Sequence, residues 1–220
     1  VFAADAAPAP DLTVAYNVGL YSQYIFRGLT QTDRTPALQG GVDLTHSSGL
    51  YLGMWGSNIS WLQDDYGLPG ATTKVYDKGG NLEIDIYGGY RYNFGDTGLG
   101  IDIGALQYWY PGSRGFTGGV QNAKANTTEI YAAQNFTFGP VTGFAKVSYA
   151  VTTLFGTANS TGSYYPDLTL NYDTGVWGLA LNGHVGYQYV AGNQNKGTTA
   201  FPASNWIGNS VANVSNSTLY

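Results

Sequence analysis

Hydrophobic and polar residues alternate along most of this chain with a period of two. The clearest case is the segment 81–94, where every second position from Leu82 to Phe94 is aliphatic, aromatic or glycine. The intervening positions include Glu83, Asp85 and Arg91. Successive side chains of a β-strand point to opposite faces, whereas a helix would scatter these residues around its axis. The segment is therefore predicted to be a strand with one apolar and one polar face.

The same alternation predicts nine strands. They cover residues 12–28, 36–46, 50–60, 81–94, 99–110, 128–138, 141–151, 164–173 and 179–189. Most are close to the roughly ten residues that a tilted strand needs to cross a membrane. The segment 50–60 is apolar on both faces, so its orientation stays open.

The connections between these strands alternate in length. Short, turn-forming connections are expected at 47–49, 95–98, 139–140 and 174–176, and long polar ones near 29–35, 61–80, 111–127, 152–163 and 190–216. This alternation is typical of an outer-membrane barrel, which has short periplasmic turns and longer external loops. Residues 1–11 are then a flexible lead-in on the periplasmic side, and residues 12–220 form the barrel.

Composition narrows the class of protein further. Charged residues make up 10% of the chain, against about 25% in ordinary soluble domains. The 15% aromatic content argues against disorder, the absence of Cys excludes a disulfide framework, and a net charge of -5 argues against nucleic acid as a partner. No apolar run is long enough for a membrane helix. The 19 Tyr and 32 Gly fit an antiparallel barrel.

Aromatic residues gather near the expected strand ends. Those toward the long connections are Tyr24, Phe26, Trp55, Trp61, Tyr108, Trp109, Tyr110, Tyr164, Tyr165, Tyr187 and Tyr189. Those toward the short turns are Tyr90, Tyr92, Phe94, Phe136, Phe138, Tyr172 and Trp177. Two belts of aromatic side chains mark the two interfaces of a membrane barrel. The pattern therefore predicts that these rings lie at the lipid boundary, although tyrosine is also simply a good strand residue.

Six segments carry a resemblance to a known family. They are 22–33 (SQYIFRGLTQTD), 36–43 (PALQGGVD), 46–53 (HSSGLYLG), 55–58 (WGSN), 82–90 (LEIDIYGGY) and 110–112 (YPG). The chain resembles the TorF family of proteobacterial porins, specifically over 12–111 and more loosely to 189. The resemblance implies a transmembrane antiparallel up-and-down β-barrel in the bacterial cell outer membrane.

The strand count departs from that family. Bacterial single-chain barrels have an even number of strands, and TorF-family members look as though they carry about three more than the nine found here. We therefore expect about twelve strands, with the protein continuing beyond Tyr220. The alternative is a ten-stranded barrel closed by a short strand near 215–220.

If the apolar faces meet lipid, the polar faces line the lumen. The expected lumen residues are Arg27, Asp43, Glu83, Asp85, Arg91, Asp102, Glu129, Lys146, Asp167 and Asp173. Seven acidic minus three basic side chains leave four net negative charges, which would mildly favour cations. The two arginines either set up a transverse field at a constriction or pair with nearby carboxylates to avoid a bare buried charge.

These features favour a porin-like channel for passive diffusion of small hydrophilic solutes or ions, without catalysis or a cofactor. Its other partners would be outer-membrane lipid and lipopolysaccharide, and an oligomer is possible. The alternative is a non-conducting structural or adhesive barrel whose long loops bind a partner. A rim enzyme using Ser148 and His184 is a third hypothesis, but two residues do not make a triad.

No metal site is expected, because the chain lacks Cys and its two His are distant in sequence. Asp64, Asp65 and Asp77 could hold a surface cation, but acidic loop residues are more commonly just solvated.

Overall fold

Ten strands form one antiparallel sheet in a computed structural model of the protein. The structure describes residues 11–62, 80–112, 125–157 and 159–191, together with the backbone of 76–78, 114–115 and 217–219. The strands of the sheet are, in spatial order, β1 (Leu12–Tyr21), β4 (Ala37–His46), β5 (Leu50–Asn58), β7 (Leu82–Asn93), β8 (Leu99–Trp109), β10 (Thr127–Phe138), β11 (Val141–Ala150), β12 (Tyr164–Asp173), β13 (Ala180–Tyr189) and β14 (Ser217–Leu219). Each pairs with the next one along the chain, so the topology is up-and-down.

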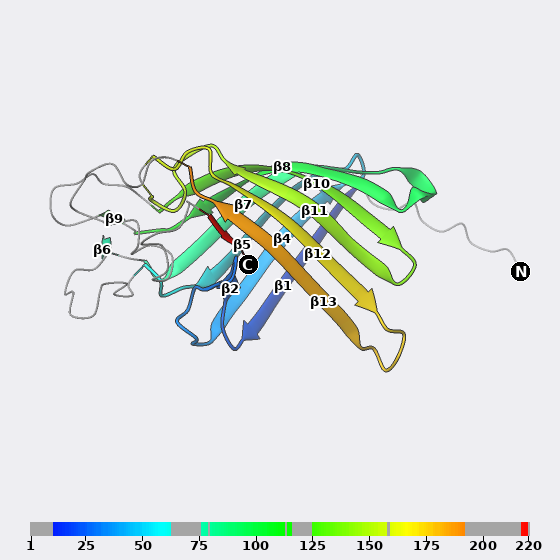
Figure 1. The fold of residues 1–220 in the computed structure, drawn as a ribbon, viewed down its shortest axis with the longest axis horizontal. Helices are drawn as coiled ribbons and strands as arrows, with labels where there is room; N and C mark the ends of the chain where they lie inside the picture. Colours follow the sequence, from blue (N-terminus) through cyan, green and yellow to red (C-terminus); the bar gives the residue numbers. More distant parts are fainter. Residues whose placement is uncertain are drawn as a thin grey trace, which may run out of the picture.

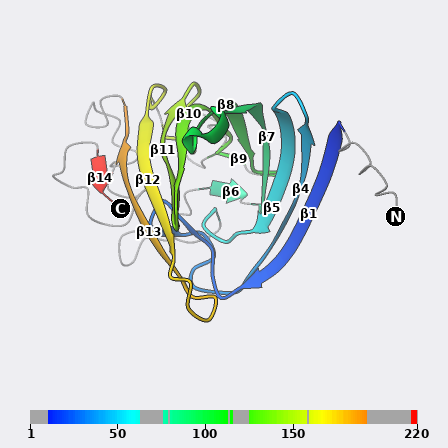
Figure 2. The same ribbon diagram turned by 90° about the vertical axis from the view of Figure 1, so that its right-hand side faces the viewer.

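The sheet is strongly curved (Figure 1), and in the turned view β1 and β13 stand on its opposite sides (Figure 2). All nine segments expected from the alternation contain a long strand, and β14 adds a short tenth strand paired with β13. Within the described residues no pairing joins β14 or β13 to β1, so no closed barrel is found there. The architecture established by the structure is therefore an all-β, up-and-down antiparallel sheet.

One expected strand is shorter than its pattern. Residues 12–28 were expected to be continuous, but β1 ends at Tyr21 and the chain turns back in a hairpin formed by β2 (Ile25–Phe26) and β3 (Leu29–Thr30). Its two central residues, Arg27 and Gly28, have φ of 45° and 78°. Two successive positive φ angles are the signature of a type I′ turn, which reverses a strand within two residues.

The remaining elements are small. β6 (Tyr76–Lys78) pairs with β9 (Arg114–Gly115), and this ribbon lies beyond the ends of β7 and β8 in Figure 1. A single 3-10 turn, η1 (Gly95–Thr97), connects β7 to β8. The turn after β12 runs from 174 to 179 and is longer than expected. The described residues contain no helix with the length and apolar character of a membrane span.

Polarity across the sheet is inverted relative to a water-soluble protein. Along β7, Glu83 is 2% exposed whereas Ile86 is 43% exposed. The outward side chains of the other strands are mostly aliphatic or aromatic and exposed, while Asp102 and Glu129 are buried on the inner face. The open orientation of 50–60 is also resolved, because Leu52 and Met54 are exposed on the outside.

Tyrosine rings on the inner face lie across glycines of the neighbouring strand. A Cβ placed on Gly89 would lie 2.7 Å from the Tyr51 hydroxyl, and one on Gly104 would lie 2.6 Å from the Tyr131 hydroxyl. Both tyrosines stand directly opposite these glycines in the strand register. The high tyrosine and glycine content thus has a packing role, since each glycine leaves room for a ring.

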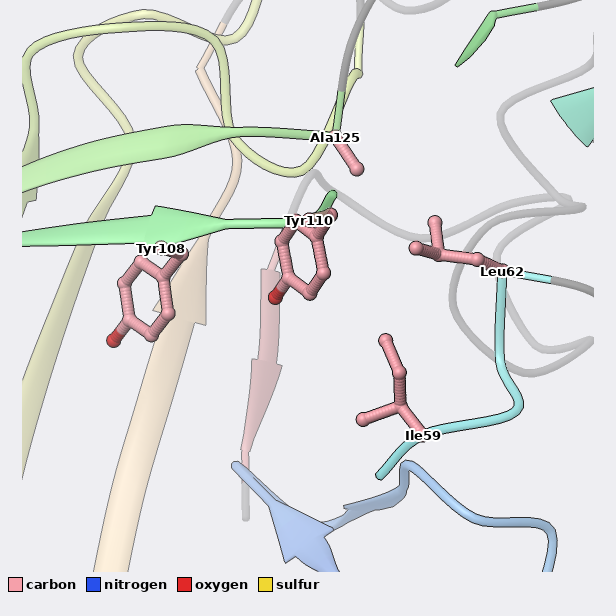
Figure 3. Close-up of a cluster of buried hydrophobic side chains, with 5 residues drawn as sticks. All are labelled: Ile59, Leu62, Tyr108, Tyr110 and Ala125. Carbon is pink, nitrogen blue, oxygen red and sulfur yellow. The ribbon is translucent and has the colours of Figure 1, made fainter. Parts of the chain in front are cut away.

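The main apolar core fills one end of the concave interior, where the long connections lie. Its buried members are Ile59, Leu62, Tyr108, Tyr110 and Ala125, with Tyr24, Phe26, Trp61, Leu106 and Phe155 packed against them. Figure 3 shows Tyr108 and Tyr110 projecting from the same side of β8 and its extension, with Ile59 and Leu62 facing them from the segment after β5.

This core corrects part of the expected outer aromatic belt, although other members such as Trp109, Tyr92 and Phe138 are exposed. Tyr24, Phe26, Trp61, Tyr108 and Tyr110 all lie inside, not at a lipid boundary. The physical reason is the strand period: Trp109 is exposed on the outer face, so its two tyrosine neighbours must point inward. An aromatic cluster at a strand end does not by itself say which face its rings occupy.

Candidate functional site

The β2–β3 hairpin carries Arg27 at its tip into the concave interior. The guanidinium makes a bidentate pair with Glu129 of β10, with Nη1–Oε1 and Nη2–Oε2 distances of 2.9 and 2.7 Å. Nη1 also donates to Gln188 Oε1 of β13 at 2.8 Å. Arg27 therefore connects two strands that are not neighbours in the sheet.

Aromatic rings enclose the same guanidinium. Its central carbon lies 4.4 Å from the centroid of the Tyr165 ring and 4.8 Å from that of Phe26. Burial disfavours the charged form of Arg27, but the Glu129 carboxylate more than offsets it and raises the pKa above the usual value. The Arg27 side chain therefore remains a cation at any accessible pH.

Further contacts hold the base of the hairpin. The Tyr24 hydroxyl donates to Glu83 Oε1 of β7 at 2.8 Å, and the Tyr24 ring meets Trp55 of β5 edge-on at a centroid distance of 5.4 Å. The Gln31 carbonyl accepts from the Ser60 amide at 2.8 Å. The segment from Tyr24 to Gln31 thus crosses the interior and contacts strands on both sides of it.

Three carboxylates lie next to the segment from Tyr24 to Gln31, which we call the crosspiece. Glu83 and Glu129 are each tied to the hairpin, through Tyr24 and Arg27. Asp85 stands opposite Trp55 on β5 and opposite Tyr108 on β8, and directly opposed residues present their side chains on the same face. Asp85 Oδ1 is buried and has no hydrogen-bond partner among the described residues. This end of the interior therefore holds one carboxylate oxygen that the hairpin does not satisfy.

A second layer of polar groups lies nearer the short turns. Arg91 donates to Asp102 Oδ2 from Nη2 at 2.8 Å and from Nε at 3.1 Å. Tyr51 donates to Asp102 Oδ1 at 2.5 Å and also contacts the Tyr131 hydroxyl. The Tyr87 hydroxyl of β7 donates to Asp43 Oδ1 of β4 at 2.6 Å. Tyrosine hydroxyls therefore supply many of the partners of the inward carboxylates.

A third group lies on β11 to β13. Asp167 pairs with Lys146 Nζ at 3.8 Å and with His184 Nε2 at 2.9 Å. Ser148 is buried on β11, opposite Tyr165. The histidine that the rim-enzyme hypothesis relied on thus has a carboxylate partner on the adjacent strand.

The structure brings together most of the expected lumen residues. Arg27, Asp43, Glu83, Asp85, Arg91, Asp102, Glu129, Lys146 and Asp167 all lie on the inner side of the sheet, and both arginines are paired with carboxylates. Asp173 shares their phase but is exposed at the end of β12, where its Oδ1 accepts from the Gly175 amide at 2.9 Å and shapes the turn.

Sequence reasoning missed the aromatic and amide partners of these charges. Tyr24 donates to Glu83, and Gln188 accepts from Arg27. The Tyr131 hydroxyl contacts that of Tyr51, and the Trp55 ring packs edge-on against Tyr24. The alternation places Tyr131 and Gln188 on the polar faces of their strands, but the expected lumen residues include only charged side chains.

No metal site is evident among the described residues, where no three His, Asp or Glu side chains group suitably. Asp64 and Asp65 lie outside the described residues, and Asp77 is described only as backbone. Residues 1–10 of the expected lead-in and most of the connection at 190–216 also lie outside the described residues.

Comparison with known proteins gives one match. A family model described as "Bacterial protein of unknown function (Gcw_chp)" covers residues 5–210. No curated protein and no solved structure matches the chain. The chain therefore belongs to the bacterial Gcw_chp family, whose function is not known.

Proposed function

We propose that the chain forms a porin-like channel in the bacterial outer membrane, through which small hydrophilic solutes or ions diffuse passively. The observation that carries the proposal is the inverted polarity of the sheet. Aliphatic and aromatic side chains cover its outer face, and acidic side chains are buried inside. Water-soluble proteins rarely expose so large a continuous apolar surface, whereas a barrel that contacts lipid and lipopolysaccharide requires one.

Closure of the sheet is part of this proposal. An unpaired strand edge cannot lie in hydrocarbon, because its amide and carbonyl groups find no water there. The edges of the described sheet are β1 and β14. A membrane barrel would join them directly, with ten strands, or through additional strands, with about twelve as the TorF-family resemblance implies.

Inward charges would select the solute. Six acidic side chains, Asp43, Glu83, Asp85, Asp102, Glu129 and Asp167, face three basic ones, Arg27, Arg91 and Lys146. Six minus three leaves three net negative charges on the inner face, fewer than the sequence predicts because Asp173 lies at a turn. Such a lumen favours cations over anions, and the crosspiece from Tyr24 to Gln31 narrows it at the long-loop end.

Planar-bilayer recordings test the channel directly. We expect stepwise currents from the folded, purified protein and a reversal potential in a KCl gradient that indicates cation preference. Asp43→Asn should reduce that preference because it removes an inward charge, whereas Asp173→Asn, the same change at an exposed turn, should leave it unchanged. Bilayers that stay silent with protein shown to be folded would overturn the proposal.

One observation favours a second candidate. The interior at the long-loop end is filled by the crosspiece and by the aromatic core around Tyr108 and Tyr110. A plug of this kind suits a non-conducting barrel whose long loops bind a partner. A silent bilayer together with outer-membrane location would favour this alternative.

A further inference from the structure

Asp85 is the one acidic side chain of the crosspiece region with a buried oxygen that receives no hydrogen bond within the described residues. We propose that Asp85, with Trp55, Tyr108 and Tyr24, forms a binding site for the ammonium group of a small organic amine. The site deepens the proposed function by naming a solute class, and its role in passage rests on that function. Binding itself does not require conduction.

The walls of the site follow from strand register. Trp55 and Tyr108 stand directly opposite Asp85 on the two neighbouring strands, so three side chains of one row share the inner face. Tyr24 covers this row from the hairpin, with its ring edge-on to Trp55 at 5.4 Å. A carboxyl group flanked by aromatic rings on both sides combines an ionisable acceptor with π-faces that attract cations.

The charge balance points to a cationic ligand. Glu129 is neutralised by the bidentate Arg27, and Glu83 accepts from the Tyr24 hydroxyl. Asp85 is only 8% exposed, yet its Oδ1 receives no hydrogen bond from any described residue. A buried carboxylate oxygen without a donor is costly. A ligand that brings both N–H donors and a positive charge would remove that cost.

Ammonium suits the site better than a metal ion does. Ca²⁺ takes six to eight oxygen ligands, whereas the described residues offer no suitable group of three acidic or histidine side chains. A primary ammonium needs fewer acceptors, because it can donate to Asp85 while its remaining surface rests against the rings of Trp55 and Tyr108.

Methylammonium chloride is the probe for a test on the full chain purified in detergent. It would be titrated at constant ionic strength against NaCl, with tryptophan fluorescence and the thermal midpoint as two readouts. We expect a saturable fluorescence change and a rise in midpoint with methylammonium but not with sodium, because a ligand of the native state stabilises it. Trp55→Phe should remove most of the fluorescence change, which assigns the signal among the five tryptophans.

Asp85→Asn is the decisive variant, since it keeps the shape and replaces the carboxyl group with an amide that cannot ionise. It should weaken methylammonium binding about tenfold or more, the loss expected for one charge-assisted hydrogen bond. Asp173→Asn, the same change at an exposed turn, should bind like the unchanged protein. Should Asp85→Asn fail to fold, Trp55→Leu serves instead, with a lowered affinity read from the thermal midpoint.

Three results would overturn the site: no saturable response to methylammonium, an equal response to sodium, or an undiminished response in Asp85→Asn. These results are separate from the fate of the channel. Methylammonium binding with silent bilayers would refute conduction only, and conduction without binding would refute this site only.

Discussion

At the scale of residues, the two inward arginines show how burial determines the contribution of an ion pair to stability. The Arg27 side chain is 8% exposed and its partner Glu129 is buried as well, whereas that of Arg91 is 51% exposed beside Asp102. Removing one partner of a buried pair leaves an uncompensated charge and costs about 3–5 kcal/mol. Exposed pairs contribute about 0–1 kcal/mol. The two Arg–carboxylate pairs should therefore differ widely in how much they contribute to the free energy of unfolding.

Arg27→Ala should accordingly lower the free energy of unfolding by about 3–5 kcal/mol, because it leaves the buried Glu129 carboxylate without its counter-charge. Arg91→Ala, the matched control, should cost clearly less, because Arg91 is half exposed and Asp102 keeps the Tyr51 hydroxyl as a donor. Urea unfolding of the detergent-solubilised protein measures both. If the protein conducts, Arg27→Ala should also raise single-channel conductance, since the hairpin loses its attachment to β10 and β13. Equal costs for the two variants would contradict the importance assigned to the Arg27 pair.

The charged residues of the inner face were predictable because they share the phase of their strands. Glu83 and Asp85 alternate with Ile84 and Ile86, and a strand can bury only one of the two sets. Their partners were not predictable. The pairing of Arg27 with Glu129 joins residues 102 positions apart and depends on a hairpin that folds into the interior. The unsatisfied Asp85 oxygen depends on that same long-range arrangement.

At the scale of elements, period-two alternation located the long strands well but did not detect where β1 ends. Tyr24 and Phe26 keep the apolar phase of β1, so the segment reads as one strand although Ser22 and Ile25 interrupt the alternation just after Tyr21. The turn at Arg27 and Gly28 carries the signal, since glycine there accommodates a positive φ. Alternation reports which face a residue occupies, whereas turn chemistry reports where a strand stops.

The fit of tyrosine rings over glycines also belongs to this scale, and Gly89 tests it. A Cβ there would lie 2.2 Å from the Ile103 carbonyl oxygen and 2.7 Å from the Tyr51 hydroxyl. We expect Gly89→Ala to reduce the free energy of unfolding by about 1–3 kcal/mol, as overpacking commonly does. Gly183→Ala on β13 is the control, because a Cβ there meets nothing within 4 Å. Chemical unfolding of both variants measures the difference, and equal stabilities would refute the close-packing role.

At the scale of the whole molecule, the central question is which solvent covers the outer face. The sequence predicts a sheet with one apolar side, and the structure has that side outermost. What the structure establishes is the all-β up-and-down sheet. Closure in lipid, and the channel that would depend on it, are inferred from the inverted polarity and from the cost of a bare strand edge.

Lysine substitutions at two exposed valines can tell whether lipid or water covers that face. Val147 lies within β11 and is 49% exposed, and Val176 lies in the turn after β12 and is 52% exposed. If water covered both, replacing either with lysine would change stability by no more than about 0.5 kcal/mol. In a bilayer, a lysine on the lipid face of a barrel strand costs up to about 2–4 kcal/mol near the midplane and much less near the interfaces. Val147→Lys should therefore destabilise the protein in lipid vesicles while Val176→Lys does not. Both variants add the same charge, so a change of no more than about 0.5 kcal/mol in each would place the sheet in water and remove the basis for the channel.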